Sequence, residues 1–485
     1  MYAFRKRFTS GFTFSARITF IALIVRLIPV MSTMNLGIGL DDMFQYDMLA
    51  RSLATGNGYR WYAEQDLQLI QPYINIDLTS GDYDPRGVLT SFRPPLYPFF
   101  LAMIYLVVGI GSERFFFTRL VQVFVGAILV PLTYALSKSL FPEAEKAARI
   151  SAWATALFPM LVVYPLSFTT ENLFFPLILG ATLVLLKAVE KRTWSWFAIS
   201  GFVLGLMALT RSIALVYVGL AIAWIWFQLH ERRNAAIALT AVLFVIAPWI
   251  IRNSLLNHRL TGIENALGYQ LYVGYNPAGT GTFQYPQSLD LMTTLDDAKR
   301  DDIGRAKTLE FIKINPGRVP YLFIRRAGYF FGLERRALTY IYSNNYFGFI
   351  PFPALISIAL IFLLPFMLVG ISASLGLAVV RWQPGSILVA FLFLGYILPH
   401  LLIVAEDRFH LALIPFLGIV AAHGWLGGGK ALAARWQSRG GKIAIVIASI
   451  VAVLMIINWG GEIWRDADRI SALLGPYGNQ TYFPY

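Results

Sequence analysis

The sequence predicts an all-α protein that crosses a membrane many times. Of its 485 residues, 57% are hydrophobic and 14% are charged, whereas about a quarter of a soluble chain is charged. The apolar residues form long continuous runs, and a membrane helix needs about 20 of them in a row. Strands of a membrane barrel would alternate apolar and polar residues instead, so these runs predict helices.

Eleven apolar stretches are interpreted as membrane spans. They cover residues 18–34, 115–136, 150–166, 173–188, 194–209, 213–229, 235–251, 350–380, 386–404, 411–426 and 443–459. The first resembles a signal peptide, but Arg26 and Pro29 interrupt it and no clear cleavage site follows, so we expect an uncleaved span. Counting residues 95–110 as a crossing would invert every later loop. We therefore expect that segment to be a re-entrant or surface-lying helix.

The basic residues predict the orientation. With the N-terminus in the cytoplasm, the short inner loops carry most Lys and Arg, and the short outer loops carry only Arg211 and Arg408, as the positive-inside rule requires. We expect one membrane domain, 1–485, in the plasma (inner) membrane. Outside the cytoplasm lie two long loops, 35–114 and 252–349, and a tail, 460–485. The net charge of +13 fits inner loops and anionic lipid, not nucleic acid. The chain has no cysteine, which excludes disulfides and thiolate chemistry.

An acidic pair, Asp41-Asp42, opens the first outer loop. The next residues place Met43, Tyr46, Ala50 and Leu53 on one helical face, and Gly56 is a natural helix stop. Either aspartate suits the helix N-cap. A carboxylate at this membrane face is also a candidate general base.

The same loop ends in Phe92-Arg93-Pro94-Pro95. The following proline holds Arg93 extended, and the planar fork of a guanidinium matches a phosphate. An arginine whose side chain simply reaches the lipid headgroups is the alternative.

Three more charged residues face the same side. Glu171 precedes a span, as a helix cap or a second functional carboxylate. Arg211 and Arg408 depart from the inside bias of basic residues, which indicates function, although Arg408 has Glu406 and Asp407 as ready partners. Arg26 lies within a span and needs an interior partner, which the sequence does not identify. His410 and His423 lack metal-ligand spacing, which favours structural roles.

The second outer loop is predicted to contain two helices. Residues 296–313 repeat apolar positions at helical spacing. Residues 319–333 mix aromatics with Arg325 and Arg326, as a helix on a membrane surface does. The turn-rich stretch before them, within 266–285, is expected to cover the site and exclude water.

Taken in order, these motifs resemble the GT-C fold glycosyltransferases, the superfamily of the protein O-mannosyltransferases and the lipid A aminoarabinose transferase. The matching elements are Asp42 with Tyr46, Leu49-Ala50 with Leu53, Gly56 and Gly58-Tyr59, Arg93-Pro94-Pro95, Glu171, Leu209-Thr210-Arg211, and Pro248-Trp249 with Arg252-Asn253. The family commonly has Asp-Glu where this chain has Asp41-Asp42 followed by Met43. The spacing to the tyrosine favours Asp42.

The resemblance implies transfer of a sugar from a polyprenyl-phosphate donor to a hydroxyl acceptor on the extracytoplasmic face, with inversion. Asp42, or Asp41, would be the base. The phosphate would be bound by Arg93 and Arg211, with Arg408 in reserve. Contacts to the acceptor or the covering loop are assigned to Tyr46, Tyr59, Tyr269 and Asn276. Glu171 would position the acceptor or, as in some relatives, share Mg²⁺ or Mn²⁺ with Asp42; no cofactor is certain.

The implied partners are the lipid-linked donor, the acceptor and membrane lipid, with no nucleic acid. Two other functions stay open from the sequence. One is a transporter or flippase of lipid-linked sugars, which would place charges deep in several spans. The other is a polysaccharide polymerase or ligase of an unrelated membrane class, in which Arg325 and Arg326 would act. The sugar, the acceptor, the carrier length and the oligomeric state are not specified.

Overall fold

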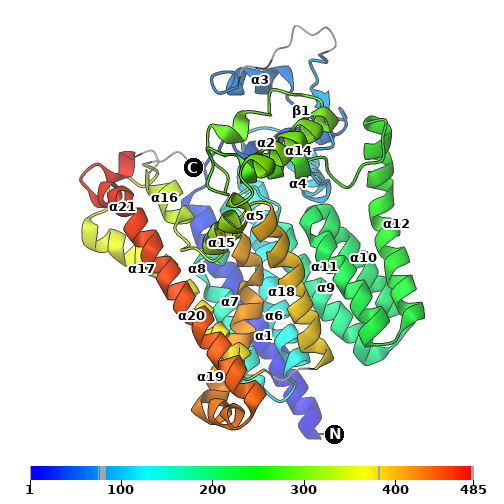
Figure 1. Ribbon diagram of the computed structural model, residues 1–485, viewed down its shortest axis with the longest axis vertical. Coiled ribbons are helices and arrows are strands. Elements are labelled where there is room, and N and C mark those ends of the chain that lie inside the picture. The colour runs from blue at the N-terminus through cyan, green and yellow to red at the C-terminus, as the bar shows by residue number, and fades with distance from the viewer. Residues whose placement is uncertain (1, 75, 77–82, 344, 381–382, 482–485) are drawn as a thin grey trace.

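The structure, a computed structural model, describes residues 2–74, 76, 83–343, 345–380 and 383–481. Long upright helices form a bundle, and shorter elements form a layer across one end (Figure 1). The strands of the described residues are β1 (Arg60–Trp61) and β2 (Val88–Leu89), which pair antiparallel in that layer. The prediction of an all-α polytopic membrane protein is confirmed.

Eight helical segments within the described residues are long and apolar enough to cross a membrane. They are residues Thr13–Ser32 of α1 (Tyr2–Ser32), the pair α5 (Glu113–Ala127) and α6 (Leu129–Leu140), α9 (Glu171–Lys191), α12 (Arg232–Leu256), α17 (Phe352–Leu377), α18 (Pro384–Leu402), the pair η5 (Asp407–Leu413) and α19 (Ile414–Trp436), and α20 (Arg439–Arg465). A ninth candidate is bent by 54° between α7 (Glu145–Leu157) and the pair α8 (Pro159–Val163) and η1 (Tyr164–Leu166).

Helices occur at all eleven predicted spans, but two are shorter than the eight long segments. These are α10 (Trp194–Thr210) and the run formed by η2 (Ser212–Ala214), α11 (Leu215–Ala223) and η3 (Trp224–Gln228). Arg211 separates them in an extended conformation, with φ −146°. The segment predicted as a non-crossing helix is α4 (Leu96–Val108), whose 13 residues are too few to span a bilayer.

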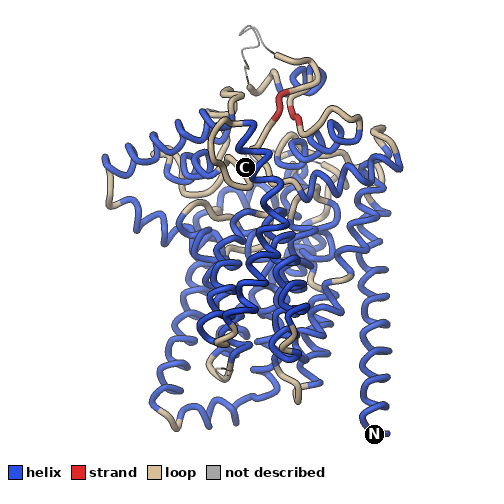
Figure 2. The backbone as a smooth tube through the Cα atoms, turned by 90° about the vertical axis from the view of Figure 1, so that its right-hand side faces the viewer, coloured by secondary structure: helices blue, strands red, loops and turns tan. Residues whose placement is uncertain are grey.

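The layer at the end of the bundle comes from the two long loops and the last residues described. It contains α2 (Asp42–Ala54), α3 (Glu64–Ile70), α13 (Leu267–Tyr275), η4 (Gln287–Leu289), α14 (Asp297–Ile314), α15 (Arg318–Phe330), α16 (Arg336–Ser343), α21 (Ala467–Leu474) and η6 (Gly478–Gln480). The N-terminus lies at the opposite end of the bundle (Figure 2). The helices predicted at 296–313 and 319–333 correspond to α14 and α15.

The two long loops pack into one apolar cluster. Phe44, Trp61 and Phe92 of the first loop contact Tyr269 and Met292 of the second in that cluster. Helix α2 packs its predicted apolar face on α4 in a second cluster. The loops are therefore a folded layer, and their positions over the bundle are fixed by burial.

Arg26 in α1 finds its partners on a broken helix. Its guanidinium is fully buried and donates to the carbonyls of Thr155 at 3.1 Å and Ala156 at 3.0 Å. Both carbonyls belong to the last turn of α7, just before Pro159, which has no N–H to donate. The interior partners of Arg26, which the sequence does not identify, are thus backbone carbonyls. Arg26 supplies the hydrogen-bond donors that these carbonyls need.

Replacing Arg26 by methionine is expected to destabilise the fold. The change leaves buried carbonyls without donors, at a cost of about 1–3 kcal/mol for each unsatisfied group. The melting temperature of the purified protein in detergent should therefore fall. Arg17→Met, on an exposed position of the same helix, is the matched control and should leave it unchanged. Equal melting temperatures for the two variants would contradict this account of Arg26.

Candidate active site

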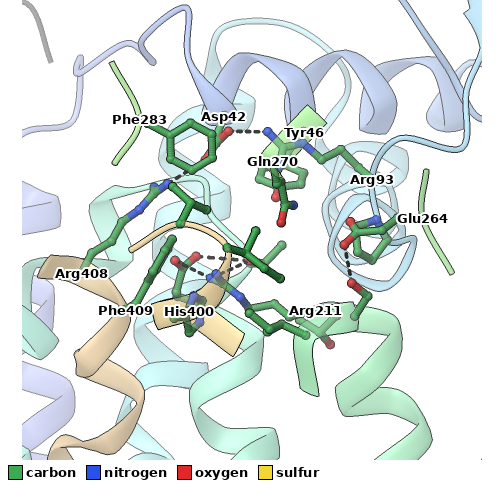
Figure 3. A pocket seen from close by; sticks show the side chains of 18 residues that line it. Asp42, Tyr46, Arg93, Arg211, Glu264, Gln270, Phe283, His400, Arg408 and Phe409 are labelled. Atoms are coloured by element: carbon green, nitrogen blue, oxygen red, sulfur yellow. Dashed lines mark hydrogen bonds and ion pairs between the residues drawn. The ribbon is translucent and has the colours of Figure 1, made fainter. Parts of the chain in front are cut away.

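A pocket opens where the layer meets the bundle. Its open space, with the solvent at its mouth, is about 650 Å³. The lining residues come from both long loops and from several helix ends: Asp42, Tyr46, Arg93, Pro94, Thr170, Glu171, Thr210, Arg211, Ser212, Ile213, Glu264, Gln270, Phe283, His400, Ile403, Val404, Arg408 and Phe409. Figure 3 shows the guanidiniums of Arg93 and Arg408 directed toward Asp42.

The start of α2 places one carboxylate in the pocket. Asp41 is the N-cap, and its side chain accepts from the backbone N–H of Met43 at 2.9 Å. Asp42 is then the first residue of the helix. It turns into the pocket, with 30% of its side chain exposed. Asp41 is thus the cap of α2, and Asp42 is the member of the acidic pair that lines the pocket.

The loop that carries Arg93 is held by the second long loop and by Tyr59, which directly precedes β1. Asp297, at the start of α14, accepts from the hydroxyl of Thr90 at 2.7 Å and the N–H of Ser91 at 2.5 Å. The hydroxyl of Tyr59 donates to the carbonyl of Arg93 at 3.0 Å. The guanidinium of Arg93 is therefore presented from a fixed backbone.

Asp42 lies between two guanidiniums, which approach it from opposite sides (Figure 3). One carboxylate oxygen binds Arg93, and the other accepts from Nη2 of Arg408 at 2.9 Å. Burial alone would raise the pKa of Asp42, but these two positive charges outweigh it and hold the pKa below the usual range of an aspartate. Asp42 is thus an ionised carboxylate with both oxygens engaged.

A second pair forms across the pocket. Arg211 lies at the break between α10 and η2, and its Nη1 is 2.6 Å from Oε1 of Glu171, the first residue of α9. The carboxylate of Glu171 is almost fully buried. The guanidinium of Arg211 also lies 5.0 Å from the ring centre of Phe409, within the range of a cation–π contact.

Arg408 connects the pocket to the second long loop. Its Nε donates to Glu406 at 2.8 Å, and the other oxygen of Glu406 is 2.9 Å from Arg336 of α16. Arg336 also pairs with Asp407 at 2.8 Å. The alternative partner of Arg408, Glu406, is therefore a real one, but Arg408 binds it and Asp42 together.

Tyr46 lies beside Arg93 in the lining. The ring centre of Tyr46 is 5.3 Å from the Arg93 guanidinium carbon. Burial raises the pKa of Tyr46 to about 12, so the phenol keeps its proton at neutral pH. Tyr46 can therefore donate a hydrogen bond to a ligand in the pocket.

Three of the residues predicted to contact the acceptor or the covering loop lie outside the lining. Tyr59 supports the Arg93 segment, as described above. The hydroxyl of Tyr269 donates to the carbonyl of Ser288 at 2.8 Å, and Asn276 accepts from the N–H of Ala278 at 3.0 Å. These polar groups are satisfied within the fold. From the predicted covering stretch, 266–285, it is Gln270 and Phe283 that border the pocket.

Two charged or titratable lining residues were not predicted. Glu264, in the loop after α12, accepts a hydrogen bond from the hydroxyl of Ser212 and has no ion pair among the described residues. Burial raises the pKa of Glu264, against the pull of Ser212, Arg93 and Arg211. His400 lies near the end of α18; a titratable residue inside an apolar span is a signal of function that the sequence does contain.

Other residues of interest lie elsewhere. Arg326 is buried and donates to the carbonyl of Gly274 at 2.6 Å, and Arg325 donates to the hydroxyl of Tyr321 at 2.8 Å. Neither lines the pocket. His410 has a structural position, with its ring nitrogens against the Phe330 carbonyl and the Glu334 carboxylate.

The arrangement does not fit a metal ion shared by Asp42 and Glu171. Each carboxylate is held by a guanidinium, and those positive charges oppose a cation at the same place. Across the part of the chain that the structure describes, no group of three or more His, Asp or Glu side chains is placed to hold a metal ion.

Residues 92–251 match the family model of dolichyl-phosphate-mannose-protein mannosyltransferases. This segment contains Arg93, Glu171 and Arg211. The match confirms the family resemblance for residues 92–251. Asp42 and Arg408 lie outside it. No curated protein matches the chain significantly.

Two of the solved structures with a similar fold are an archaeal and a bacterial membrane protein. An oligosaccharyltransferase of Archaeoglobus fulgidus, tethered to an acceptor peptide, has a TM-score of 0.49 and 14% identity over 98% of this chain and 59% of its own. ArnT of Cupriavidus metallidurans, bound to undecaprenyl phosphate, has a TM-score of 0.47 and 15% identity over 96% of this chain and 73% of its own. This chain thus spans 59% of the length of that oligosaccharyltransferase.

Removing one partner of the Glu171–Arg211 pair is expected to destabilise the protein strongly. Arg211→Met leaves a buried carboxylate without its cation, a change that costs about 3–5 kcal/mol in comparable buried pairs. The double variant Arg211→Met with Glu171→Gln should recover most of the lost stability, because it removes the unpaired charge. Thermal unfolding in detergent measures both.

The pair Lys187–Glu190, 2.7 Å apart and exposed on the same helix α9, is the control. Lys187→Met should change stability by less than about 0.5 kcal/mol, as exposed pairs do. If Arg211→Met and Lys187→Met lower the stability by the same amount, the buried pair stabilises the fold no more than an exposed pair, which would contradict this prediction.

Proposed function

We propose that this chain is a membrane glycosyltransferase that moves a sugar from a polyprenyl-phosphate carrier to a hydroxyl acceptor, with inversion at the anomeric carbon. The observation that carries the proposal is the convergence of three arginines and an ionised aspartate on one pocket at the end of a membrane bundle. Arg93, Arg211 and Arg408 come from separate segments of the chain. Their shared chemistry is recognition of a phosphate.

The arginines are held ready by carboxylates. Asp42 binds Arg93 and Arg408, and Glu171 binds Arg211, so the cations keep their positions before a donor arrives. A phosphate that enters the pocket competes for the same guanidinium N–H groups. Because the surroundings are partly apolar and buried, these contacts are stronger than they would be in water.

The donor also changes the state of Asp42. A free Asp42 is a weak base, since two guanidiniums lower its pKa. Once the phosphate takes up part of the hydrogen bonding of Arg93 and Arg408, Asp42 regains a free oxygen and its pKa rises. Donor binding therefore prepares the base that the acceptor needs.

The transfer is then an in-line displacement. The acceptor oxygen forms a bond to the anomeric carbon while its proton passes to Asp42. The bond between that carbon and the phosphate oxygen breaks, and its electron pair leaves on the lipid phosphate. The three arginines stabilise this developing negative charge, and they are already in place before the reaction begins.

Glu171 acts mainly on Arg211 in this mechanism. The carboxylate is buried, and its second oxygen accepts from the Thr170 hydroxyl at 3.2 Å. The resemblance implies that Glu171 positions the acceptor or shares a metal ion, but its contacts to Arg211 and Thr170 support the positioning of a different group. The group positioned is the Arg211 guanidinium, at the phosphate end of the substrate.

The reaction is assigned to the extracytoplasmic face of the plasma (inner) membrane. The layer of short elements that contributes to the pocket lies at the end of the bundle away from the N-terminus (Figure 2). The positive-inside distribution of Lys and Arg supports a cytoplasmic N-terminus. The chain 1–485 would then act as one membrane domain, with its two long loops above the site.

Asp42→Asn is expected to abolish transfer while the protein still folds, because Arg93 keeps Gln45 as a partner, Arg408 keeps Glu406, and the Asp42 side chain is 30% exposed. Loss of a general base lowers a rate by about 10²–10⁴-fold. Undecaprenyl phosphate should bind to the variant at least as well as to the wild type, because a competing negative charge is removed. The transfer readout is mass spectrometry of surface glycans and lipids from cells lacking the gene, complemented with each variant.

Asp41→Asn is the matched control for this experiment. Asp41 is adjacent to Asp42 and caps α2, a role that asparagine fulfils as well. The Asp41→Asn protein should restore the missing product. Full restoration by Asp42→Asn would show that Asp42 is not the base and would reject the proposed mechanism.

A further inference from the structure

His400 is a buried polar side chain without a partner in the lining of the pocket. The residue is 2% exposed. Neither of its ring nitrogens makes a hydrogen bond within the described part of the chain. The backbone of Val404 lies near the ring, but the two do not form a hydrogen bond of ordinary geometry. A buried group of this kind costs free energy unless a ligand satisfies it.

The imidazole is held in place by aromatic rings. Its centre lies 4.3 Å from that of Phe409 in a stacked contact and 4.9 Å from that of Tyr396 in an edge contact. The Tyr396 hydroxyl in turn donates to the carbonyl of Phe409 at 3.0 Å. The two aromatic contacts therefore hold the plane of the ring.

Two of the pocket arginines pack on the same aromatic ring. The guanidinium carbons of Arg211 and Arg408 lie 5.0 and 5.6 Å from the centre of the Phe409 ring. These two arginines and Glu171 are the charged groups that interact electrostatically with His400. Phe409 thus gathers two cations and an imidazole on one side of the pocket (Figure 3).

The other histidines of the bundle differ from His400. His410 is equally buried, but each ring nitrogen has a partner, at 2.7 Å and 2.8 Å. His423 stacks on Phe141 at 3.8 Å and lies outside the pocket lining. The missing partner at His400 is therefore not a general property of histidines in this fold.

We propose that His400 is a ligand of the carrier phosphate: a ring N–H donates to a phosphate oxygen that Arg211 and Arg408 also bind. This inference rests on the proposed function and extends it. It assigns a neutral donor to the phosphate subsite, on the Phe409 side. His400 holds the leaving phosphate and accepts no proton from the acceptor.

Binding of undecaprenyl phosphate to the purified full chain tests this assignment. His400→Phe keeps a ring for stacking and removes both nitrogens. It should weaken binding about tenfold or more, as loss of a hydrogen bond to a charged group does. His400→Gln retains a donor and should recover part of the affinity. His423→Phe, the matched control, should bind as the wild type does.

Undecaprenol, which lacks the phosphate, separates a lost hydrogen bond from a general packing defect. Wild type and His400→Phe should bind undecaprenol equally. If His400→Phe does not fold, histidine ring ¹⁵N NMR signals of the wild-type protein give the answer instead. Addition of undecaprenyl phosphate should shift the signals of His400, assigned by their absence from His400→Asn, and leave those of His423 in place.

The outcomes distinguish this inference from the function on which it rests. If Arg93→Gln weakens binding of undecaprenyl phosphate but His400→Phe does not, or if the His400 signals do not move, His400 is not a phosphate ligand and the function stands. If neither substitution weakens binding, the pocket does not hold the carrier phosphate. Both proposals are then overturned.

Discussion

The pairing of buried guanidiniums with carboxylates is the constraint on which the pocket depends. A lone charge at this depth would pay a large desolvation cost, so each arginine needs an anion while the site is empty. Asp42 serves Arg93 and Arg408, and Glu171 serves Arg211. In the proposed mechanism an incoming phosphate replaces an internal anion, so that recognition of the donor and activation of the base are parts of one exchange of partners.

The layer above the bundle keeps these charges in position. Asp297 of the second loop fixes the backbone just before Arg93, and Arg336 of the same loop holds Glu406 against Arg408. Arg252, at the end of α12, donates to the carbonyl of Thr90 at 2.5 Å. Both arms that reach Asp42 are thus anchored in the second loop. A movement of that loop would therefore change the contacts of the Asp42 carboxylate.

Much of this architecture follows from the sequence because its signals are local. Continuous hydropathy predicts the helices, and the spacing of Met43, Tyr46 and Ala50 predicts the apolar face of α2. Prolines after Arg93 predict its stiff presentation. The shortness of the helices on either side of Arg211 is less evident, because the apolar run resumes directly after the break and only the backbone conformation reveals it.

The remaining features depend on contacts between distant segments. The partners of Arg26 are backbone carbonyls freed by a helix break, and no side-chain pattern encodes them. Tyr59, Tyr269 and Asn276 look available as polar residues in loops, yet the fold satisfies their polar groups internally. Glu264 lies in a loop without a recognisable motif. Only the fold, which brings it next to Ser212 and Arg211, shows that it lines the pocket.

The most direct test of the central claim is an experimental structure of the protein in nanodiscs with undecaprenyl phosphate. The account predicts that the phosphate lies within hydrogen-bond distance of Arg93, Arg211 and Arg408, and that at least one oxygen of Asp42 has lost its guanidinium partner. A phosphate bound outside this pocket, with both contacts of Asp42 intact, would contradict it.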